Sequence, residues 1–498
     1  MRELIRICVN ISTRVTLLKL RKAIAPQLFL LMAGCAAVGP DYKAPEIDAP
    51  DAWKEAVINE VDADNSPLEQ WWSTFNDPML DSLLDRAKNA NLDLRIALER
   101  IFEAQAFNRI AGGDKYPDLN ADGGFNRTKT TLPILGDNPQ SLWTSGLVTS
   151  WEVDVFGRVR RAIEATEAEV GASIEDYRDV MVSLYAQIAI NYVNVRSIQQ
   201  RLIYAQDNVD SQRQTLALVE FRLEAGLVPP YDVAQAKYNL ANTETLIPEL
   251  IPALENALNQ LAILLGQTPG SLDQELSEAS GLPVAKTELA IAPPAELLRR
   301  RPDIRQAERQ LASQTARIGV ATAELYPQFS LDGALTLGAS EFGDLDNKVG
   351  WSFAPGVRWN LFSGGKVQSL IDVEESRTKQ AFISYEKTVL NAFAEVETTM
   401  VAMRQEALRA EKFSEAVSAS QESVELVTSG YMAGLSDFQA LLDSQRSLSI
   451  QQDKLVESQG LVVINFINLN RALGGGWSID DPILADDDNQ SIKTKEGN

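Results

Sequence analysis

The sequence contains an internal duplication, and this limits the possible folds more than any other feature. Over more than 120 residues, position i matches position i+208 without a gap. Pairs at this offset include Trp143 and Trp351, Trp151 and Trp359, Gly226 and Gly434, and Leu265-Gly266 and Leu473-Gly474. Upstream the offset is 210, as in Asp93-Leu94-Arg95 and Asp303-Ile304-Arg305. We therefore expect one structural unit to occur twice, in residues 71–280 and 281–480.

Each copy contains two stretches in which apolar residues alternate with polar or small ones. The alternation has a period of two and predicts hairpins over about 117–155 and about 325–361. Their strands would be about 10–13 residues long, with tryptophan near both ends of the apolar stripe. Such strands are typical of a transmembrane β-barrel, although a hairpin packed on a soluble core would show the same alternation.

After each hairpin the pattern becomes helical. The stretches 157–225 and 365–433 contain no proline, and the second keeps a heptad spacing of apolar and small residues, as in a coiled coil. Each would form a helix roughly 100 Å long. Gly226 and Gly434 are placed to end these two helices.

Shorter helices are expected to run back along both long ones. The patterns predict them over about 230–265 and 437–473, and Pro248 and Pro252 should kink the first. One chain thus supplies four strands and two antiparallel helix pairs. Because open strand edges cannot persist in hydrocarbon, other copies of the chain would have to complete the barrel.

The composition excludes several classes of function. The chain has 498 residues, no histidine, two cysteines and a formal net charge of −23. Catalysis that needs an imidazole base is impossible, and no histidine metal cluster can form. The negative charge argues against a nucleic-acid partner. We expect neither an enzyme nor a bound cofactor or metal, since only the number of carboxylates would favour a hydrolase.

The N-terminus has the features of a bacterial lipoprotein signal. Six basic residues precede a short apolar run that ends in Leu31-Met32-Ala33-Gly34-Cys35, which resembles a lipobox. We predict a signal peptide over 1–34, lipidation of Cys35 and a lipid-anchored extended segment over 35–70. Removal of the signal would leave a net charge of −28. The acidic tail, 481–498, is predicted to be disordered.

Six motifs in a fixed order carry a family resemblance. The chain resembles the TolC/OprM-type outer-membrane factors, specifically their NodT-type lipoprotein subgroup, over about residues 35 to 480. The motifs are Gly39-Pro40-Asp41-Tyr42, Trp71-Trp72-Ser73-Thr74-Phe75, Trp151-Glu152-Val153-Asp154-Val155-Phe156-Gly157-Arg158, Arg301-Pro302-Asp303-Ile304, Trp359-Asn360-Leu361-Phe362-Ser363-Gly364-Gly365 and Leu441-Leu442-Asp443-Ser444-Gln445-Arg446.

The resemblance implies an α+β membrane protein that is a homotrimer. Three chains would form a 12-stranded β-barrel in the outer membrane, continuous with a 12-helix α-barrel in the periplasm. The tube would be the passive exit duct of a tripartite efflux or secretion system. Its partners would be a periplasmic adaptor protein, an inner-membrane pump and outer-membrane lipid.

The resemblance also suggests functional residues. The turns Ala225-Gly226-Leu227 and Ala433-Gly434-Leu435 would contact the adaptor, although both also read as ordinary helix caps. Asp443 and Arg446, three residues apart on one helical face, match positions of the periplasmic gate, as does Tyr431. Gln439 stands where relatives carry a leucine ring. An ordinary solvated ion pair is the alternative for Asp443 and Arg446.

A second hypothesis for the whole chain is a lipid-anchored periplasmic coiled-coil scaffold or adaptor without a pore. It accounts for Cys35 and for the heptads, but not for two hairpins with tryptophans at equivalent places.

Overall fold

The computed structural model describes residues 37–50, 52–54, 68–129, 139–284, 294–342 and 349–478, without the side chains of 296–298. The signal peptide, Cys35 and the acidic tail lie outside these residues. The chain divides into two compact units, and each draws on both sequence copies. Unit 1 comprises Met1–Glu46, Arg100–Ser173 and Gln306–Glu386, and unit 2 comprises Ile47–Glu99, Ile174–Arg305 and Lys387–Asn498.

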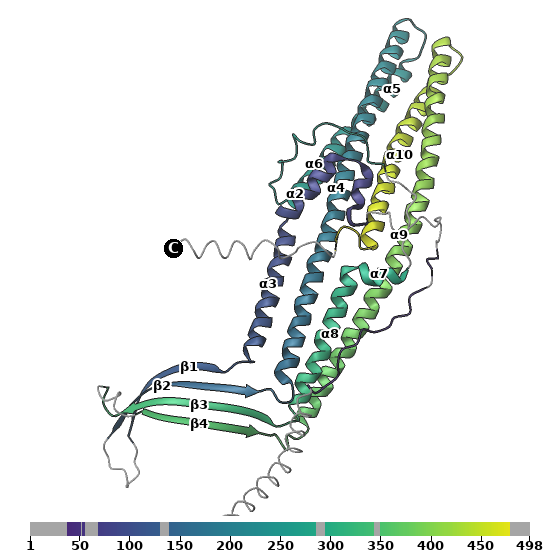
Figure 1. Cartoon of the computed structure of the whole chain (residues 1–498). Coiled ribbons are helices and arrows are strands. Elements are labelled where there is room, and N and C mark those ends of the chain that lie inside the picture. The colour runs from purple at the N-terminus through teal and green to yellow at the C-terminus, as the bar shows by residue number, and fades with distance from the viewer. Residues whose placement is uncertain are drawn as a thin grey trace, which may run out of the picture. The chain divides into compact units, whose positions relative to one another are not determined.

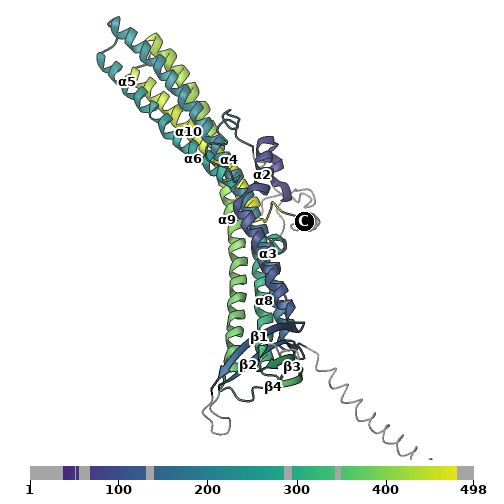
Figure 2. The same cartoon turned by 90° about the vertical axis from the view of Figure 1, so that its left-hand side faces the viewer.

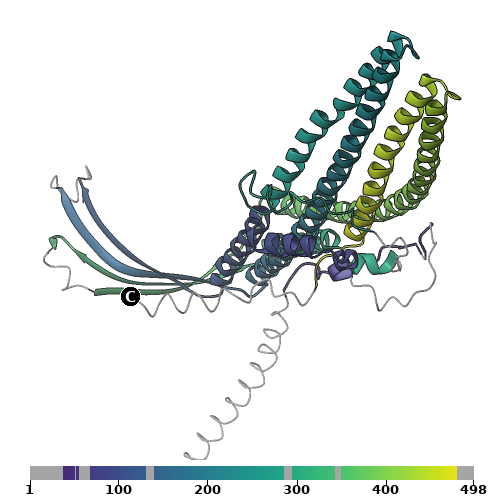
Figure 3. The ribbon, with the colours of Figure 1, turned by 90° about the horizontal axis from the view of Figure 1, so that it is seen from above.

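Unit 1 contains a curved antiparallel sheet (Figures 1 and 3). Its strands are β1 (Asp118–Thr128), β2 (Gln140–Val153), β3 (Gln328–Ala339) and β4 (Val349–Arg358), in the order β1-β2-β3-β4. The two hairpins are those expected from the alternation, and the β2–β3 pairing joins the two copies. Within the described chain, β1 and β4 each pair on one side only.

The strand register keeps the two predicted faces apart. One row across the sheet contains Ala121, Leu147, Leu335 and Trp351, and the adjacent row contains Asn120, Val148, Ala334 and Ser352. Every pairing joins odd positions to odd and even to even, so the apolar stripe runs across all four strands.

Tryptophans at equivalent positions in the two copies bind the chain just before the first strand of each hairpin. The indole nitrogen of Trp151 donates to the carbonyl oxygen of Lys115 at 3.1 Å, and that of Trp359 donates to Leu325 at 3.0 Å.

The two long helices are α4 (Arg158–Glu224) and α9 (Lys366–Ala433), where stretches 157–225 and 365–433 were expected. Two further helices, α3 (Leu92–Gly113) and α8 (Pro302–Ala323), were not predicted. Their bounds differ by 210 residues, which is the offset of the upstream repeat. Each has an aspartate in its first turn, Asp93 or Asp303, and this is a common signal for a helix start.

In unit 2 the helix α10 (Phe438–Ala472) runs back along α9, and α5 (Pro230–Glu244) runs back along α4 (Figure 2). The stretch expected as one kinked return helix over 230–265 is helical from Pro230 to Leu264 with one interruption, at a residue whose φ and ψ of −67° and −21° stay in the helical region. The chain forms α5 and a separate helix, α6 (Leu246–Leu264), with the break at Thr245. Pro248 explains the position, because its ring clashes with the carbonyl group four residues earlier, at Glu244, and it has no N–H to donate there.

Shorter elements complete unit 2. They are a 3₁₀ helix, η2 (Leu68–Phe75), and the helices α2 (Pro78–Ala90) and α7 (Pro294–Arg300). Asp77 caps α2 by accepting hydrogen bonds from the N–H groups of Met79 and Leu80. Its other carboxylate oxygen accepts from the hydroxyl group of Tyr192 at 2.6 Å, which ties α2 to α4.

Aromatic side chains form a large part of the unit 2 core. The rings of Trp71 and Phe75 from η2 pack on Phe466 of α10 with centroids 6.5 and 5.3 Å apart. The heptad seam of α9 is buried from Val389 to Met403 but is exposed at Ser414 and Gln421, which have little apolar surface to bury.

Candidate functional site

The two long helices, α4 and α9, each end in a hydrogen-bonded turn of the same type. Gly226 and Gly434 have φ angles of +69° and +74°, a conformation that favours glycine. The N–H of Leu227 donates to the carbonyl of Arg222 at 2.9 Å, and that of Leu435 donates to Gly430 at 2.8 Å. These are Schellman caps, so the helix-cap reading of both turns is correct. The leucine side chains remain 70% and 85% exposed.

A buried cluster joins the two helix pairs below these turns. It combines Val219 of α4 and Val233 and Ala236 of α5 with Tyr431 of α9 and Phe438, Leu441 and Leu442 of α10. Tyr431 is only 3% exposed, and its hydroxyl group has no hydrogen-bond partner among the described residues. The structure therefore places this predicted gate residue in the core between the pairs.

Arg222 connects the two turns, and the sequence analysis missed it. Its guanidinium group lies 4.5 Å from the ring centroid of Tyr431 and donates to the carbonyl oxygens of Tyr431 and Met432 at 2.9 and 3.0 Å. It thereby satisfies carbonyl groups at the C-terminal end of α9. In the second copy the equivalent position is Gly430, so only one copy carries this contact.

The other predicted gate residues form one chain of hydrogen bonds on α10. Arg446 donates to Oδ1 of Asp443 at 2.8 Å, and Gln439 donates to Oδ2 of Asp443 at 3.1 Å. Gln235 of α5 donates to Gln439 at 2.6 Å, which the sequence analysis did not foresee. The side chains of Arg446 and Asp443 are 65% and 47% exposed, so this polar group lies on the surface of unit 2.

The region around the turns carries a strong negative charge. Residues 215–245 and 420–447 contain eight carboxylates and three basic side chains, a net charge of −5. Burial raises the pKa of Asp232 above its ordinary value. The net charge of −5 attracts cations to this end of the helices.

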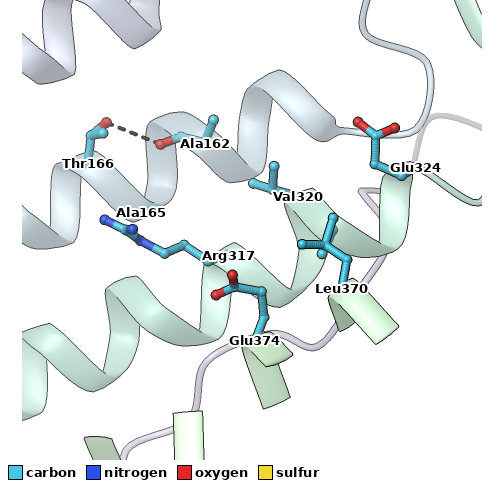
Figure 4. A pocket seen from close by; sticks show the side chains of 9 residues that line it. Ala162, Ala165, Thr166, Arg317, Val320, Glu324, Leu370 and Glu374 are labelled. Atoms are coloured by element: carbon cyan, nitrogen blue, oxygen red, sulfur yellow. Dashed lines mark hydrogen bonds between the residues drawn. The ribbon is translucent and has the colours of Figure 1, made fainter. Parts of the chain in front are cut away.

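The cavity drawn in Figure 4 lies among α4, α8 and α9 in unit 1 and has a volume of about 380 Å³. Two of its charged side chains form ion pairs: Arg317 contacts Glu169 at 3.1 Å, and Glu374 contacts Arg377 at 2.8 Å. The third, Glu324, accepts a hydrogen bond from Gln328 at 3.3 Å. Among the described residues, no group of three or more Cys, Asp or Glu side chains could hold a metal ion. The cavity therefore offers no reactive pair.

Comparison with known proteins decides the family. The profile described as "Outer membrane efflux protein" matches the chain twice, over residues 83–267 and 294–475. Together these ranges cover more than half of the chain. The chain belongs to the outer membrane efflux protein family.

Individual relatives of this efflux protein agree. It is 33% identical to nodulation protein T of Rhizobium leguminosarum bv. trifolii, covering 91% of this chain and 97% of that protein. It is 31% identical to a solvent efflux pump outer membrane protein of Pseudomonas putida, with coverages of 91% and 98%. Among solved structures, the outer-membrane channel OprN matches with a TM-score of 0.80 and 31% identity, over 88% of this chain and 99% of that one.

The efflux protein is thus an outer-membrane channel of efflux systems and not an enzyme. Its fold, with long helices and four antiparallel strands per chain, is the one that the resemblance implied. Within the described part of the chain, no helix combines the length and the apolarity needed to cross a membrane.

The N-terminal segment of the efflux protein is fixed where its described part begins. The N–H of Val38 donates to the carbonyl of Phe156 at 3.0 Å. Arg161, only 4% exposed, donates to the carbonyl oxygens of Val38 and Gly39 and to Asp41, the last at 2.6 Å. Gly39 has a φ of +88°, and a Cβ atom there would overlap Gly319. The chain three residues after Cys35 is therefore held beside the end of β2.

Proposed function

We propose that three copies of this chain form one continuous tube that serves as the exit duct of a tripartite efflux system. The observation that carries the proposal is the four-stranded sheet of unit 1, in which β1 and β4 each pair on one side only among the residues that the structure describes. A sheet with open edges is not stable in a bilayer, whereas three such sheets joined edge to edge give a closed 12-stranded barrel.

The apolar face of the sheet supports placement in lipid. On β4 the odd positions Val349, Trp351, Phe353 and Val357 are 61–79% exposed in the single chain. Exposed side chains of this size on a single sheet face suit contact with acyl chains.

Apolar side chains on two helices of unit 1 support contact between copies. Phe107 and Ile110 of α3 are 56% and 68% exposed, and Ile383 of α9 is 61% exposed. In a ring of three chains, α3 of one copy would cover α9 of the next and complete a 12-helix barrel.

The adaptor would bind at the helix turns. Ala225-Gly226-Leu227 and Ala433-Gly434-Leu435 present the same cap twice, each with an exposed leucine. A helical hairpin of a periplasmic adaptor could bury these leucines, each worth roughly 1.5–3 kcal/mol if buried fully. The proposed duct is passive, so an inner-membrane pump would supply the energy.

The periplasmic gate would consist of the polar group on α10. Gln439, Asp443 and Arg446 of three chains would form rings that narrow the pore. Tyr431, buried against Arg222, would act as the packed support on which the α9–α10 pair moves.

Lipidation of Cys35 would place the anchor next to the membrane end of the tube. The contacts of Val38 with Phe156 and of Arg161 with Val38 hold the chain beside the end of β2. The predicted acyl chains and the apolar face of the sheet would then enter the same membrane.

Electron microscopy of the detergent-extracted, lipidated protein tests the proposed assembly. We expect a hollow threefold tube with a membrane-sized β-ring. Compact or filamentous particles that leave the membrane once the anchor is cleaved would contradict the duct. They would instead support the hypothesis of a periplasmic scaffold.

The gate is tested separately by Asp443→Asn in planar lipid bilayers. In the proposed gate this pair belongs to the closed state, so its loss in three chains, at ~0.2–1 kcal/mol each, should raise the open fraction of the pore at least about threefold. Asp210→Asn is the matched control, since Asp210 pairs with Arg213 at 3.0 Å with the same spacing and similar exposure. Equal behaviour of the two variants would mean that the Asp443 pair is an ordinary surface contact.

A further inference from the structure

Two equivalent side-chain stripes meet on one surface of unit 2. On α10 the polar stripe is Gln439, Asp443 and Arg446, at positions i, i+4 and i+7. The offset of 208 maps these residues onto a second set on α5, the aromatic stripe, which comprises Tyr231, Gln235 and Tyr238. Positions i, i+4 and i+7 lie on one face of a helix.

The hydrogen bond from Gln235 to Gln439, 2.6 Å long, joins the middle of the aromatic stripe to the start of the polar stripe. The two stripes therefore form one continuous surface. Any space lined by the polar stripe is also within reach of the aromatic stripe.

Both tyrosines of the aromatic stripe are largely exposed. Each is 68% exposed, and neither ring takes part in an aromatic pair or a cation–π contact among the described residues. The second copy has Gln439 and Arg446 at the same two places, so the helix pair does not need rings there in order to fold.

The basic side chains around the aromatic stripe already have partners. Lys237 contacts Glu220 at 3.0 Å, Arg222 binds the α9 carbonyl groups, and Arg446 contacts Asp443. With eight carboxylates nearby, the rings lie in a negative field, which three copies around one axis would reinforce.

We propose that the aromatic stripe recognises aromatic organic cations as cargo at the periplasmic entrance of the pore. This inference rests on the proposed function, because it needs the polar stripe to line the channel. A tyrosine face attracts a cation that lies over it, and a flat aromatic solute also stacks on it. Neutral aromatic solutes gain only the stacking, and anions are opposed by the carboxylates.

The test is block of ion current through the purified full-length channel in a planar lipid bilayer. Tetraphenylphosphonium is the probe, and tetraphenylborate is an anion of nearly the same size and shape. The wild-type channel should be blocked by the cation at lower concentration than by the anion.

Removal of both rings should weaken the cation block. In the double variant Tyr231→Ala/Tyr238→Ala the blocking concentration should rise at least about fivefold. The double variant Tyr231→Phe/Tyr238→Phe keeps the rings and should behave as wild type. Phe221→Ala removes a 69% exposed ring outside both stripes and should also leave the block unchanged.

The outcomes separate the two proposals. If the pore conducts and the alanine variant is blocked by the cation at the same concentration as wild type, the inference alone is overturned. The same holds if loss of the rings weakens the block by the cation and by the anion equally. A wild-type protein that conducts no ions overturns the proposed function and the inference with it.

Discussion

Asp179 of α4 shows how the environment of one residue can make an efflux channel sensitive to pH. Burial raises the pKa of this carboxyl group to about 6, and the nearby charge of Asp303 adds to the effect. Arg301 and Arg471 oppose it. Arg301 also pairs with Asp303 at 2.8 Å and with Glu395 at 2.8 Å, so two carboxylates share its positive charge with Asp179.

We predict that Asp179→Asn stabilises the protein at neutral pH. Because the folded-state pKa lies above the ordinary value of 3.8, the folded chain holds this proton more tightly than the unfolded chain. The resulting stabilisation is complete below about pH 4 and is lost as the pH rises through about 6. The variant avoids an ionised buried carboxylate, so above pH 6 it should gain on the order of 1–3 kcal/mol.

Thermal melting from pH 4 to pH 8 measures this difference. The difference in melting temperature between Asp179→Asn and wild type should increase with rising pH and vanish at pH 4. Asp207→Asn, at an exposed position of the same helix, reports the general effect of removing one negative charge. A difference in melting temperature that does not change with pH would contradict the prediction.

Residues that act through local backbone geometry were predictable from the sequence, and residues that act across the fold were not. Gly226 and Gly434 could be found because a glycine after a long helix favours a left-handed cap. Arg222 and Gln235 could not, since their partners are about 200 residues away in the chain.

At the scale of elements, strong local signals gave helix bounds within about one residue, while weaker ones were missed. The α4 and α9 stretches have no proline and end in glycine. The first return helix was predicted as one element because the clash of Pro248 with the Glu244 carbonyl was treated as a kink and not as a break. The helices α3 and α8 were missed although their starts repeat at an offset of 210.

A glycine precedes each long helix, and the two glycines form a matched pair. Gly157 and Gly365 have φ angles of +84° and +83°, so an added Cβ strains both backbones equally. A Cβ at Gly157 would also lie 2.5 Å from Cβ of Ala37, whereas no atom of the described part of the chain would lie within 4 Å of a Cβ at Gly365.

We predict that Gly157→Ala releases the N-terminal segment and that Gly365→Ala does not. Both variants should lose roughly 1–2 kcal/mol through backbone strain. Only Gly157→Ala should also make residues 37–46 accessible to limited proteolysis, because Ala37 must move. Equal cleavage of the two variants would show that this contact does not hold the segment.

At the scale of the whole molecule, the sequence predicted two faces for the sheet but not its strand order. The alternation assigned Leu335 to the apolar face and Ala334 to the polar face, and the register agrees. The β2–β3 pairing joins residues almost 190 positions apart, such as Leu147 and Leu335, and no local pattern encodes it.

These neighbouring residues test which face meets lipid. Leu335→Arg should lower the amount of protein assembled in the outer membrane, because a charge facing acyl chains costs roughly 2–4 kcal/mol at mid-membrane. Ala334→Arg should assemble and change the single-channel conductance, because this position faces the lumen in the proposed barrel. Membrane fractionation and bilayer recording measure the two effects, and the opposite ranking would reverse the orientation of the sheet.

The contact of Arg222 with the end of α9 bears on how the gene can change. Arginine at 222 corresponds to glycine at 430, where a Cβ would lie 2.5 Å from the hydroxyl oxygen of Ser436. A change of Gly430 alone to arginine would therefore bring a side chain against Ser436, and a change of Arg222 to glycine would remove the arginine that makes this contact. Although the two halves repeat one sequence pattern, these two positions can no longer be exchanged one at a time.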